Sequence, residues 1–388
     1  MSAPERILHV MTAIDRGGAE NHLVELVRHQ RASGIAVTVA YLRGRGYWAP
    51  ALREMGATVH DLRLRFYGDL RPLRTLRRAV AETHFDLVHA HLPPAELYAR
   101  LALLGTPAKE LPLIISKHND CPFHRIPGER VFGRWVARRA SAVIAISDAV
   151  RKFMTGPALG LPAQKVHTIY YGIDVQPFEN VPRDSAVALR REWRAGPETL
   201  VIGFAGRLVE QKSIDTLIRA FALFRQREPR DAKLVVAGRG PLEAALRHCA
   251  DGLGVAEHVV WAGFREDVPR MMNAFDVFAI TSMHEGFGLV LVEAMAAARP
   301  VVATRAGAIP EVVIDGATGF LADSAAQVAD ALAKLTNPVL RARLGAAGRR
   351  RASADFTLEQ MWQQTDALYA RCLHSESASN AAVAVAAA

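Results

Sequence analysis

Short apolar runs alternate with longer segments of helical periodicity along the whole chain. Runs of four to eight apolar residues, bounded by turn-forming residues, are typical of buried strands. In the first half we expect strands at residues 6–12, 37–42, 58–64, 86–92, 113–118 and 142–147. In the second half we expect them at residues 201–206, 233–238, 258–263, 277–282 and 300–304.

This alternation of strands and helices predicts parallel sheets with helices on both faces. Two such series in one chain predict an α/β protein of two doubly wound, Rossmann-like domains, at residues 1–178 and 179–355. The turn-rich segment that begins near Val175 marks the boundary. Residues 356–374 have apolar positions at helical spacing and predict a final helix that packs back on the first domain, followed by a flexible tail at 375–388.

Composition adds little to this picture but excludes several classes of protein. The chain has 388 residues, half of them hydrophobic, which suits two domains. Its three cysteines, Cys121, Cys249 and Cys372, are far apart and indicate neither a disulfide framework nor a metal site. The start lacks the basic and apolar regions of a signal peptide, and no run is long enough to span a membrane. We therefore expect a cytoplasmic protein.

The net charge of +9 is concentrated in the first half. Residues 1–180 hold 24 basic and 16 acidic side chains, a balance of +8, which leaves +1 for the remainder. Local clusters contain Arg63 and Arg65, then Arg71, Arg74, Arg77 and Arg78, then Arg134, Arg138 and Arg139. Two interpretations stay open: solvated helix faces, or attraction to an anionic membrane surface or acceptor. Nucleic acid is disfavoured, because no recognition motif or aromatic platform accompanies the arginines.

Ligands of doubly wound sheets bind beyond the carboxyl ends of the strands, so residues that follow strands are the candidates for chemistry. Glu285 follows the strand at 277–282, and Gly286 and Gly288 precede a helix that we expect from about Phe287 to Ala298. Glycines at a helix start expose backbone N–H groups to a phosphate. Glu293 lies eight residues after Glu285 and presents a carboxylate that suits a ribose diol.

Two further strand ends carry groups that suit a diphosphate. Arg207 and Lys212 follow the strand at 201–206, and their cations would offset its negative charges. Gly17 and Gly18 follow the first strand at another helix start, with Glu20 in the first turn. His118 also follows a strand. Each of these features alone has an ordinary structural explanation.

Together, the EGFGL segment with its two glutamates, the GR…K segment and the GG-x-E segment resemble family 4 of the retaining glycosyltransferases. The resemblance runs from about residue 6 to residue 372. It implies the GT-B fold, in which two Rossmann-like domains face each other across a cleft. It further implies that Glu285 holds the donor sugar and Glu293 the ribose, that Arg207 and Lys212 contact the pyrophosphate, and that His118 faces the sugar.

The resemblance extends to residues around these motifs. Beside Gly17, Gly18, Gly286, Gly288 and Glu293, it places Gly206, Gly238, Phe264, Arg265, Phe287 and Leu289 on the donor. Candidates for the acceptor side are Glu20, His91, Lys117, Asn119 and Asp120, although a buried role for His91 stays open. The chain departs from the family at Ser213, where the pattern has Gly, and at Tyr171, where many members have Asn. The latter departure puts the local packing in doubt.

The resemblance implies transfer of a hexose from a UDP- or GDP-type sugar to a glycan, with retention and without metal or other cofactor. The basic first domain favours a lipid-linked acceptor of cell-surface polysaccharide synthesis at the inner membrane face. Alternatives are a nucleotide-sugar epimerase on the same fold and a non-catalytic assembly protein that kept the binding site. A nicotinamide dehydrogenase is disfavoured, because Glu243 stands where its third fingerprint glycine should be.

Overall fold

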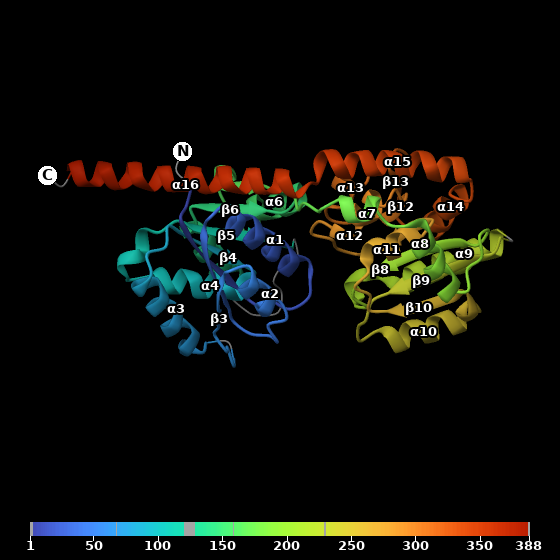
Figure 1. Cartoon of the computed structure of the whole chain (residues 1–388), viewed down its shortest axis with the longest axis horizontal. Helices are drawn as coiled ribbons and strands as arrows, with labels where there is room; N and C mark the ends of the chain where they lie inside the picture. The colour runs from blue at the N-terminus through green and yellow to red at the C-terminus, as the bar shows by residue number, and fades with distance from the viewer. Residues whose placement is uncertain (1–2, 67, 120–128, 158, 229, 387–388) are drawn as a thin grey trace. The chain divides into compact units, whose positions relative to one another are not determined.

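The computed structural model describes residues 3–66, 68–119, 129–157, 159–228 and 230–386. The chain forms two compact units. The N-terminal unit comprises Met1–Tyr171 together with Leu358–Ala388, and the C-terminal unit comprises Gly172–Thr357. Each unit is described separately below (Figure 1).

The N-terminal unit is built on a seven-stranded parallel sheet of order β3-β2-β1-β4-β5-β6-β7. The side chains of its central strands are mostly apolar and, apart from Arg6, buried, as expected when helices cover both sides of a sheet. The strands are β1 (Arg6–Met11), β2 (Ala36–Tyr41), β3 (Thr58–Asp61), β4 (Leu87–His91), β5 (Leu113–Lys117), β6 (Ala142–Ala145) and β7 (Val166–Thr168).

Helices cover both faces of this sheet. On one face, α1 (Gly18–Ala32), α2 (Ala49–Glu54) and α16 (Leu358–Ala386) share a hydrophobic cluster with β1 and β2. On the other side, α4 (Pro93–Leu103) packs on β1 and β4 and contacts α3 (Leu70–Glu82) and α5 (Glu129–Arg139). The unit also contains α6 (Asp148–Thr155) and the 3-10 turns η1 (Pro107–Glu110) and η2 (Ala163–Lys165).

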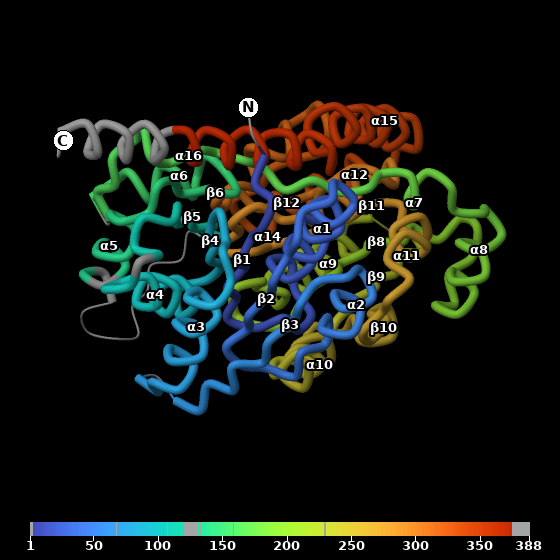
Figure 2. The backbone as a smooth tube through the Cα atoms, turned by 60° about the vertical axis from the view of Figure 1, so that its left-hand side comes forward, coloured from blue at the N-terminus to red at the C-terminus, as the bar shows by residue number. Residues whose placement is uncertain are grey.

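The final helix α16 belongs to the N-terminal unit although it follows the whole C-terminal unit in sequence. Met361, Leu368, Tyr369 and Cys372 recur at helical spacing and join the hydrophobic cluster around β1 and α1. Figure 1 shows this helix in red beside the blue-to-green strands, and Figure 2 shows its first part in red. The helix is assigned as far as Ala386, and the flexibility of residues 375–388 stays a prediction.

The C-terminal unit contains a six-stranded parallel sheet of order β10-β9-β8-β11-β12-β13. The strands are β8 (Leu200–Ala205), β9 (Ala232–Ala237), β10 (Val259–Gly263), β11 (Val277–Ile280), β12 (Val301–Thr304) and β13 (Gly319–Ala322). The helices are α7 (Gln176–Glu179), α8 (Arg183–Glu192), α9 (Ile214–Arg227), α10 (Glu243–Gly252), α11 (Val268–Ala274), α12 (Leu289–Ala296), α13 (Ile309–Val312), α14 (Ala325–Lys334) and α15 (Pro338–Asp355), with 3-10 turns η3 (Glu210–Lys212) and η4 (Ala256–His258).

The prediction of two doubly wound parallel sheets is confirmed, and every predicted strand forms. Sequence analysis missed β7 and β13, which have three and four residues and lack an extended apolar run. In both sheets the strand order reverses at the centre, between β1 and β4 and between β8 and β11. The crevice at such a reversal is where doubly wound sheets bind ligands. Residues that follow these four strands therefore form the candidate site of each unit.

Candidate functional site

In the C-terminal unit, a cation and a carboxylate meet at the reversal point of the sheet. Lys212 lies in the turn after β8 and Glu285 in the loop after β11, and the Lys212 Nζ donates to Glu285 Oε2 at 2.6 Å. The hydroxyl of Ser282 donates to the same oxygen at 3.1 Å. Both charged side chains are largely buried, with exposed fractions of 13% and 11%. The pair thus presents a fixed positive and a fixed negative group.

The loop after Glu285 closes into the start of α12. Gly288 has a φ of +87° and caps the helix, so α12 begins at Leu289 and not at Phe287 as the sequence predicts. A Cβ on Gly288 would lie 2.8 Å from Leu291 and 3.1 Å from Glu285, so this turn requires glycine. The turn leaves the first N–H groups of α12 without intrahelical partners, and the helix dipole favours an anion there.

The side chain of Phe287 faces the core of the C-terminal unit. It is 1% exposed and packs against Phe356, with 5.5 Å between ring centroids. Phe287 can therefore offer a ligand only its backbone. Gly286 is also buried, whereas Leu289 is half-buried at the helix start.

Glu293 lies on α12, two turns after Glu285. Among the residues that the structure describes, no side chain pairs with its carboxylate. Burial raises the pKa of Glu293 to about 7. An enclosed carboxylate without a protein partner is the kind of acceptor that a diol could satisfy.

Three glycine loops meet at the carboxyl ends of β8, β9 and β10. The N–H of Gly206 bonds to the carbonyl of Ala237, and the N–H of Gly238 to that of Gly263. Gly238 has a φ of +138°, and a Cβ there would lie only 1.8 Å from the Gly206 carbonyl oxygen. The backbones are thus packed as closely as glycine allows. Arg207 extends from this floor into solvent.

Phe264 and Arg265 both follow β10, but Phe264 has an exposed ring whereas Arg265 is held in ion pairs. The ring of Phe264 is 44% exposed. The guanidinium of Arg265 makes two bonds of 2.7 Å to the carboxylate of Asp267, and Glu192 lies 3.7 Å away. Of the two, Phe264 is the side chain that a flat base could stack on.

In the N-terminal unit, Gly17 and Gly18 form the turn from β1 into α1. Gly17 is the N-cap of α1 and provides no side chain to its free N–H groups. A Cβ on Gly17 would lie 2.3 Å from a carboxylate oxygen of Glu20. Gly18 is exposed, and Glu20 is half-buried in the first turn. A carboxylate oxygen of Glu20 thus lies beside this helix start, and phosphate binding there stays a prediction.

His91 is fully buried, which suits the buried role that the sequence leaves open, and its place on the acceptor side stays a prediction. It belongs to a cluster of five histidines, in which His9 lies on β1, His22 on α1, His89 and His91 on β4, and His118 directly after β5. Burial lowers the pKa of every member, to about 4 for His9 and about 3 for His118. These five histidines are therefore neutral at physiological pH.

Lys117 and His118 point to opposite faces of the sheet, as successive residues of a strand must. The ammonium of Lys117 is buried and bonds to the carboxylate of Glu96 on α4. As an acceptor-side candidate Lys117 is thus engaged inside the unit, while Asn119 is exposed. The remaining candidate, Asp120, lies outside the described residues.

In the described part of the chain, the one cluster with metal-ligand spacing is His9, His89 and His91, whose ligand atoms lie within 4.8 Å of one another. All six ring nitrogens of these histidines already have hydrogen-bond partners. Sequence analysis missed His9, His22 and Gln30. The alternating His89 and His91 were a signal, because they place two imidazoles on one face of a strand.

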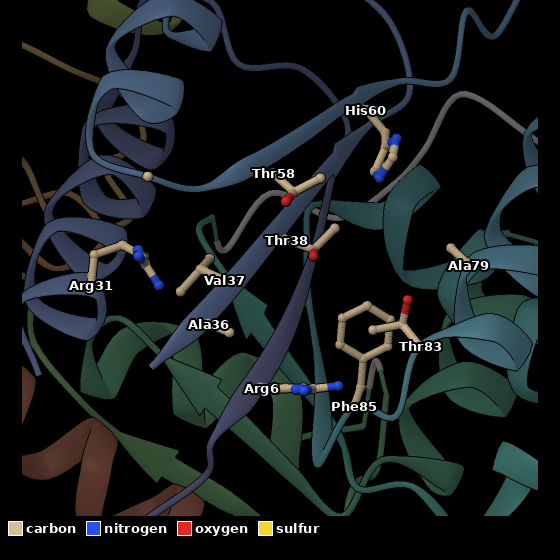
Figure 3. A pocket seen from close by; sticks show the side chains of 11 residues that line it. Arg6, Arg31, Ala36, Val37, Thr38, Thr58, His60, Ala79, Thr83 and Phe85 are labelled. Atoms are coloured by element: carbon tan, nitrogen blue, oxygen red, sulfur yellow. The ribbon is translucent and has the colours of Figure 1, made fainter. Parts of the chain in front are cut away.

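A separate hollow lies at the amino ends of β1, β2 and β3, where Arg6, Arg31 and His60 approach it (Figure 3). The Arg31 guanidinium bonds to the carbonyls of Ile35 and Met55. This is the end of the sheet opposite to the ligand-binding edge of doubly wound folds. Within the described ranges, no helix has the length and apolar character needed to span a bilayer.

Comparison with known proteins supports one family for both units. The profile "Glycosyltransferase Family 4" matches residues 16–177, and "Glycosyl transferases group 1" matches residues 187–351. The chain is 32% identical over 361 residues to a GDP-mannose-dependent alpha-(1-6)-phosphatidylinositol monomannoside mannosyltransferase of Mycobacterium tuberculosis, covering 88% of this chain and 91% of that protein. It is 31% identical to a D-inositol 3-phosphate glycosyltransferase of Thermobifida fusca, covering 87% and 85% of the two chains.

Solved structures agree with these relatives. The Anabaena HepE protein in complex with UDP and glucose superposes with a TM-score of 0.83 at 25% identity. The superposition covers 96% of this chain and 100% of that one. The similarity therefore extends across both units.

Proposed function

Because the chain belongs to the family 4 glycosyltransferases and has the GT-B fold, we propose that it transfers a hexose from a nucleoside-diphosphate sugar to a glycan with retention of configuration. That it is a glycosyltransferase acting with a nucleotide sugar follows from its relatives. The observation that carries the finer proposal is the buried Lys212–Glu285 pair at the strand-order reversal.

The candidate side chains of the C-terminal unit each suit one part of a nucleoside-diphosphate sugar. Lys212 and Arg207 provide cations for the diphosphate, and the N-terminus of α12 provides backbone donors. Glu285 accepts hydrogen bonds from the sugar hydroxyls, and Glu293 from the ribose diol. For the N-terminal unit, we propose that His118 contacts a sugar and that Gly17 and Gly18 bind a phosphate. The glycine floor at Gly206 and Gly238 supports the nucleotide, with Phe264 beside the base.

The proposed reaction is electrostatic and occurs on one face of the sugar. The bond from the anomeric carbon to the phosphate oxygen breaks, and a bond to the acceptor oxygen forms on the same face. The departing phosphate takes the proton of the acceptor hydroxyl. Lys212 and Arg207 stabilise the charge that develops on this phosphate, which removes the need for a metal.

The donor belongs to the UDP or GDP class. The mycobacterial relative is GDP-mannose-dependent by name, whereas the Anabaena structure contains UDP. Both classes share the diphosphate and ribose that Lys212, Arg207 and Glu293 address.

A lipid-linked acceptor is favoured by the surface of α3 and the loop before it. Arg65, Phe66, Leu70 and Arg74 are all exposed there, and Phe66 and Leu70 are 64% and 58% accessible. Apolar side chains among arginines suit an anionic bilayer surface. The name of the mycobacterial relative also specifies a lipid acceptor. We therefore propose peripheral binding at the inner membrane face, in polysaccharide or glycolipid assembly.

A transfer assay with a proton NMR readout tests the proposal. The purified chain is incubated with GDP-mannose or UDP-glucose and a membrane extract, and the anomeric coupling of the product is compared with that of the donor. Retention with one donor class is expected, and an inverted product contradicts the mechanism. Conversion of the donor sugar without acceptor would favour an epimerase, and binding without turnover would favour an assembly protein.

A further inference from the structure

A chain of buried hydrogen bonds connects the interior of the N-terminal unit to His118. His9 on β1 bonds through Nε2 to Gln30 Oε1 on α1 at 2.9 Å. Its Nδ1 lies 3.1 Å from His91 Nε2, and His91 Nδ1 lies 3.2 Å from His118 Nε2. The chain ends where His118 Nδ1 bonds to the hydroxyl of Tyr171. We call these five residues the histidine chain.

The two ends of the histidine chain set its direction. The Gln30 oxygen only accepts, so His9 Nε2 carries a hydrogen. A neutral imidazole has one hydrogen, which leaves His9 Nδ1 as an acceptor for His91 Nε2–H. By the same reasoning, His91 carries its hydrogen on Nε2, so its Nδ1 accepts from His118 Nε2–H. His118 therefore has its hydrogen on Nε2, and its Nδ1 accepts from the hydroxyl of Tyr171.

The chain cannot act as a proton wire, because an amide oxygen at its inner end takes up no proton at physiological pH. Nor is it arranged for a metal, since each ring nitrogen along it is engaged in a hydrogen bond. The remaining role for the chain is to fix the orientation and tautomer of a histidine. A histidine whose hydrogen-bond partner fixes its tautomer presents one defined nitrogen to its other neighbour.

We propose that Gln30, His9 and His91 are positioning residues that hold His118 in the tautomer whose Nδ1 accepts a hydrogen bond. This rests on the proposed role of His118 beside the donor sugar. A sugar hydroxyl that reaches His118 then replaces the Tyr171 hydroxyl and donates a hydrogen bond to His118 Nδ1. The proposal also accounts for the departure from the family pattern at Tyr171, because the phenol of Tyr171 donates a hydrogen bond to His118 Nδ1.

A second pair in the same cluster provides an internal control. His89 bonds through Nδ1 to the hydroxyl of Tyr369 at 2.6 Å and through Nε2 to Ser116 Oγ at 2.8 Å. Its ring centroid lies 4.0 Å from that of His91, yet its hydrogen bonds leave the histidine chain. Ser116→Ala thus removes a buried hydroxyl from His89, a histidine outside the chain, whereas Tyr171→Phe removes a hydroxyl at the end of the chain.

The test is a ¹⁵N–¹H correlation spectrum of the histidine side chains in the full-length protein at pH 7. In the wild type we expect His9, His91 and His118 as neutral Nε2–H tautomers. Gln30→Leu removes the acceptor at the inner end, so an Nδ1–H signal should appear at His118. Gln30→Glu restores an acceptor and should return the Nε2–H form. Ser116→Ala should leave His118 unchanged.

Kinetics then separate positioning from mere folding. Gln30→Leu should lower kcat/KM for the donor by roughly tenfold, about one hydrogen bond, and Gln30→Glu should recover most of it. An Nδ1–H or charged His118 in the wild type would overturn the proposal, as would a stoichiometric metal bound to His9, His89 and His91. Unchanged kinetics in Gln30→Leu, despite a changed tautomer, would also overturn it. The spectrum is read without turnover, so absent transferase activity would count against the proposed function alone.

Discussion

Lys212 and Glu285 are 73 residues apart in sequence, and the Lys212 ammonium lies 2.6 Å from a carboxylate oxygen of Glu285. They meet because β8 and β11 are neighbours at the centre of the C-terminal sheet. Each side chain is held in one place by the other. A charged pair that is held before a ligand arrives needs little reorganisation during reaction.

Lys212→Ala should reduce kcat by roughly 10²–10³, the typical cost of losing one charge-stabilising donor. The variant also leaves Glu285 without its cation. Steady-state kinetics with saturating donor measure the effect, and Lys334→Ala, an exposed lysine on α14, is the control. Near-normal turnover in Lys212→Ala would remove Lys212 from the diphosphate site.

Glu293→Gln should weaken nucleoside-diphosphate binding roughly 10–100-fold at pH 8, because hydrogen bonds to a charged group are worth about 1.5–3 kcal/mol. Calorimetric titration measures this loss. Unchanged affinity would show that Glu293 does not hold the ribose.

The same substitution should raise the thermal stability of the ligand-free protein at pH 8. Burial raises the pKa of Glu293 from its ordinary 4.5 to about 7, so the folded chain keeps a proton that the unfolded chain loses. The free energy of unfolding therefore falls as pH rises from about 4.5 to 7. Glutamine does not titrate, so Glu293→Gln does not lose free energy of unfolding in this way as the pH rises. A wild-type Tm at pH 8 equal to or above that of Glu293→Gln would contradict this assignment.

The buried histidines should make the N-terminal unit sensitive to acid. Burial lowers the pKa of His9 to about 4, and those of His22, His89 and His91 also fall well below 6.5. In the unfolded chain these groups take up protons near pH 6.5, so the free energy of unfolding decreases as pH falls from about 6.5 to 4. Urea unfolding at pH 7 and pH 5 measures it. A midpoint that does not fall at pH 5 would mean that these histidines are not buried neutral.

Membrane binding should depend on the exposed arginines near α3. Arg65→Ala with Arg74→Ala should weaken binding to anionic vesicles, by about 1 kcal/mol for each arginine near the surface. Co-sedimentation with phosphatidylserine vesicles at low and high salt measures the effect. Arg343→Ala with Arg350→Ala removes the same charge from exposed positions of α15. If both pairs weaken binding equally, or if neutral vesicles bind as well, the α3 surface is not the docking surface.

The sequence predicted part of the local structure around its motifs. Two glutamates around Gly286 and Gly288 predicted the loop and helix start, and the structure places them after the central strand β11. Periodicity could not show that Phe287, within that motif, faces the core, because its partner Phe356 is far away in sequence. The histidine chain was missed for the same reason. His9, Gln30, His91 and His118 come from four elements, and only the fold brings them together.

The central claim is that the C-terminal unit holds a nucleoside-diphosphate sugar through Lys212, Glu285 and Glu293. The most direct measurement is calorimetric titration of the wild type, Lys212→Ala and Glu293→Gln with UDP and GDP at pH 8. We predict that one nucleotide binds the wild type and that both variants lose at least about tenfold in affinity. Binding of neither nucleotide to the wild type, or equal binding to all three proteins, would contradict the account.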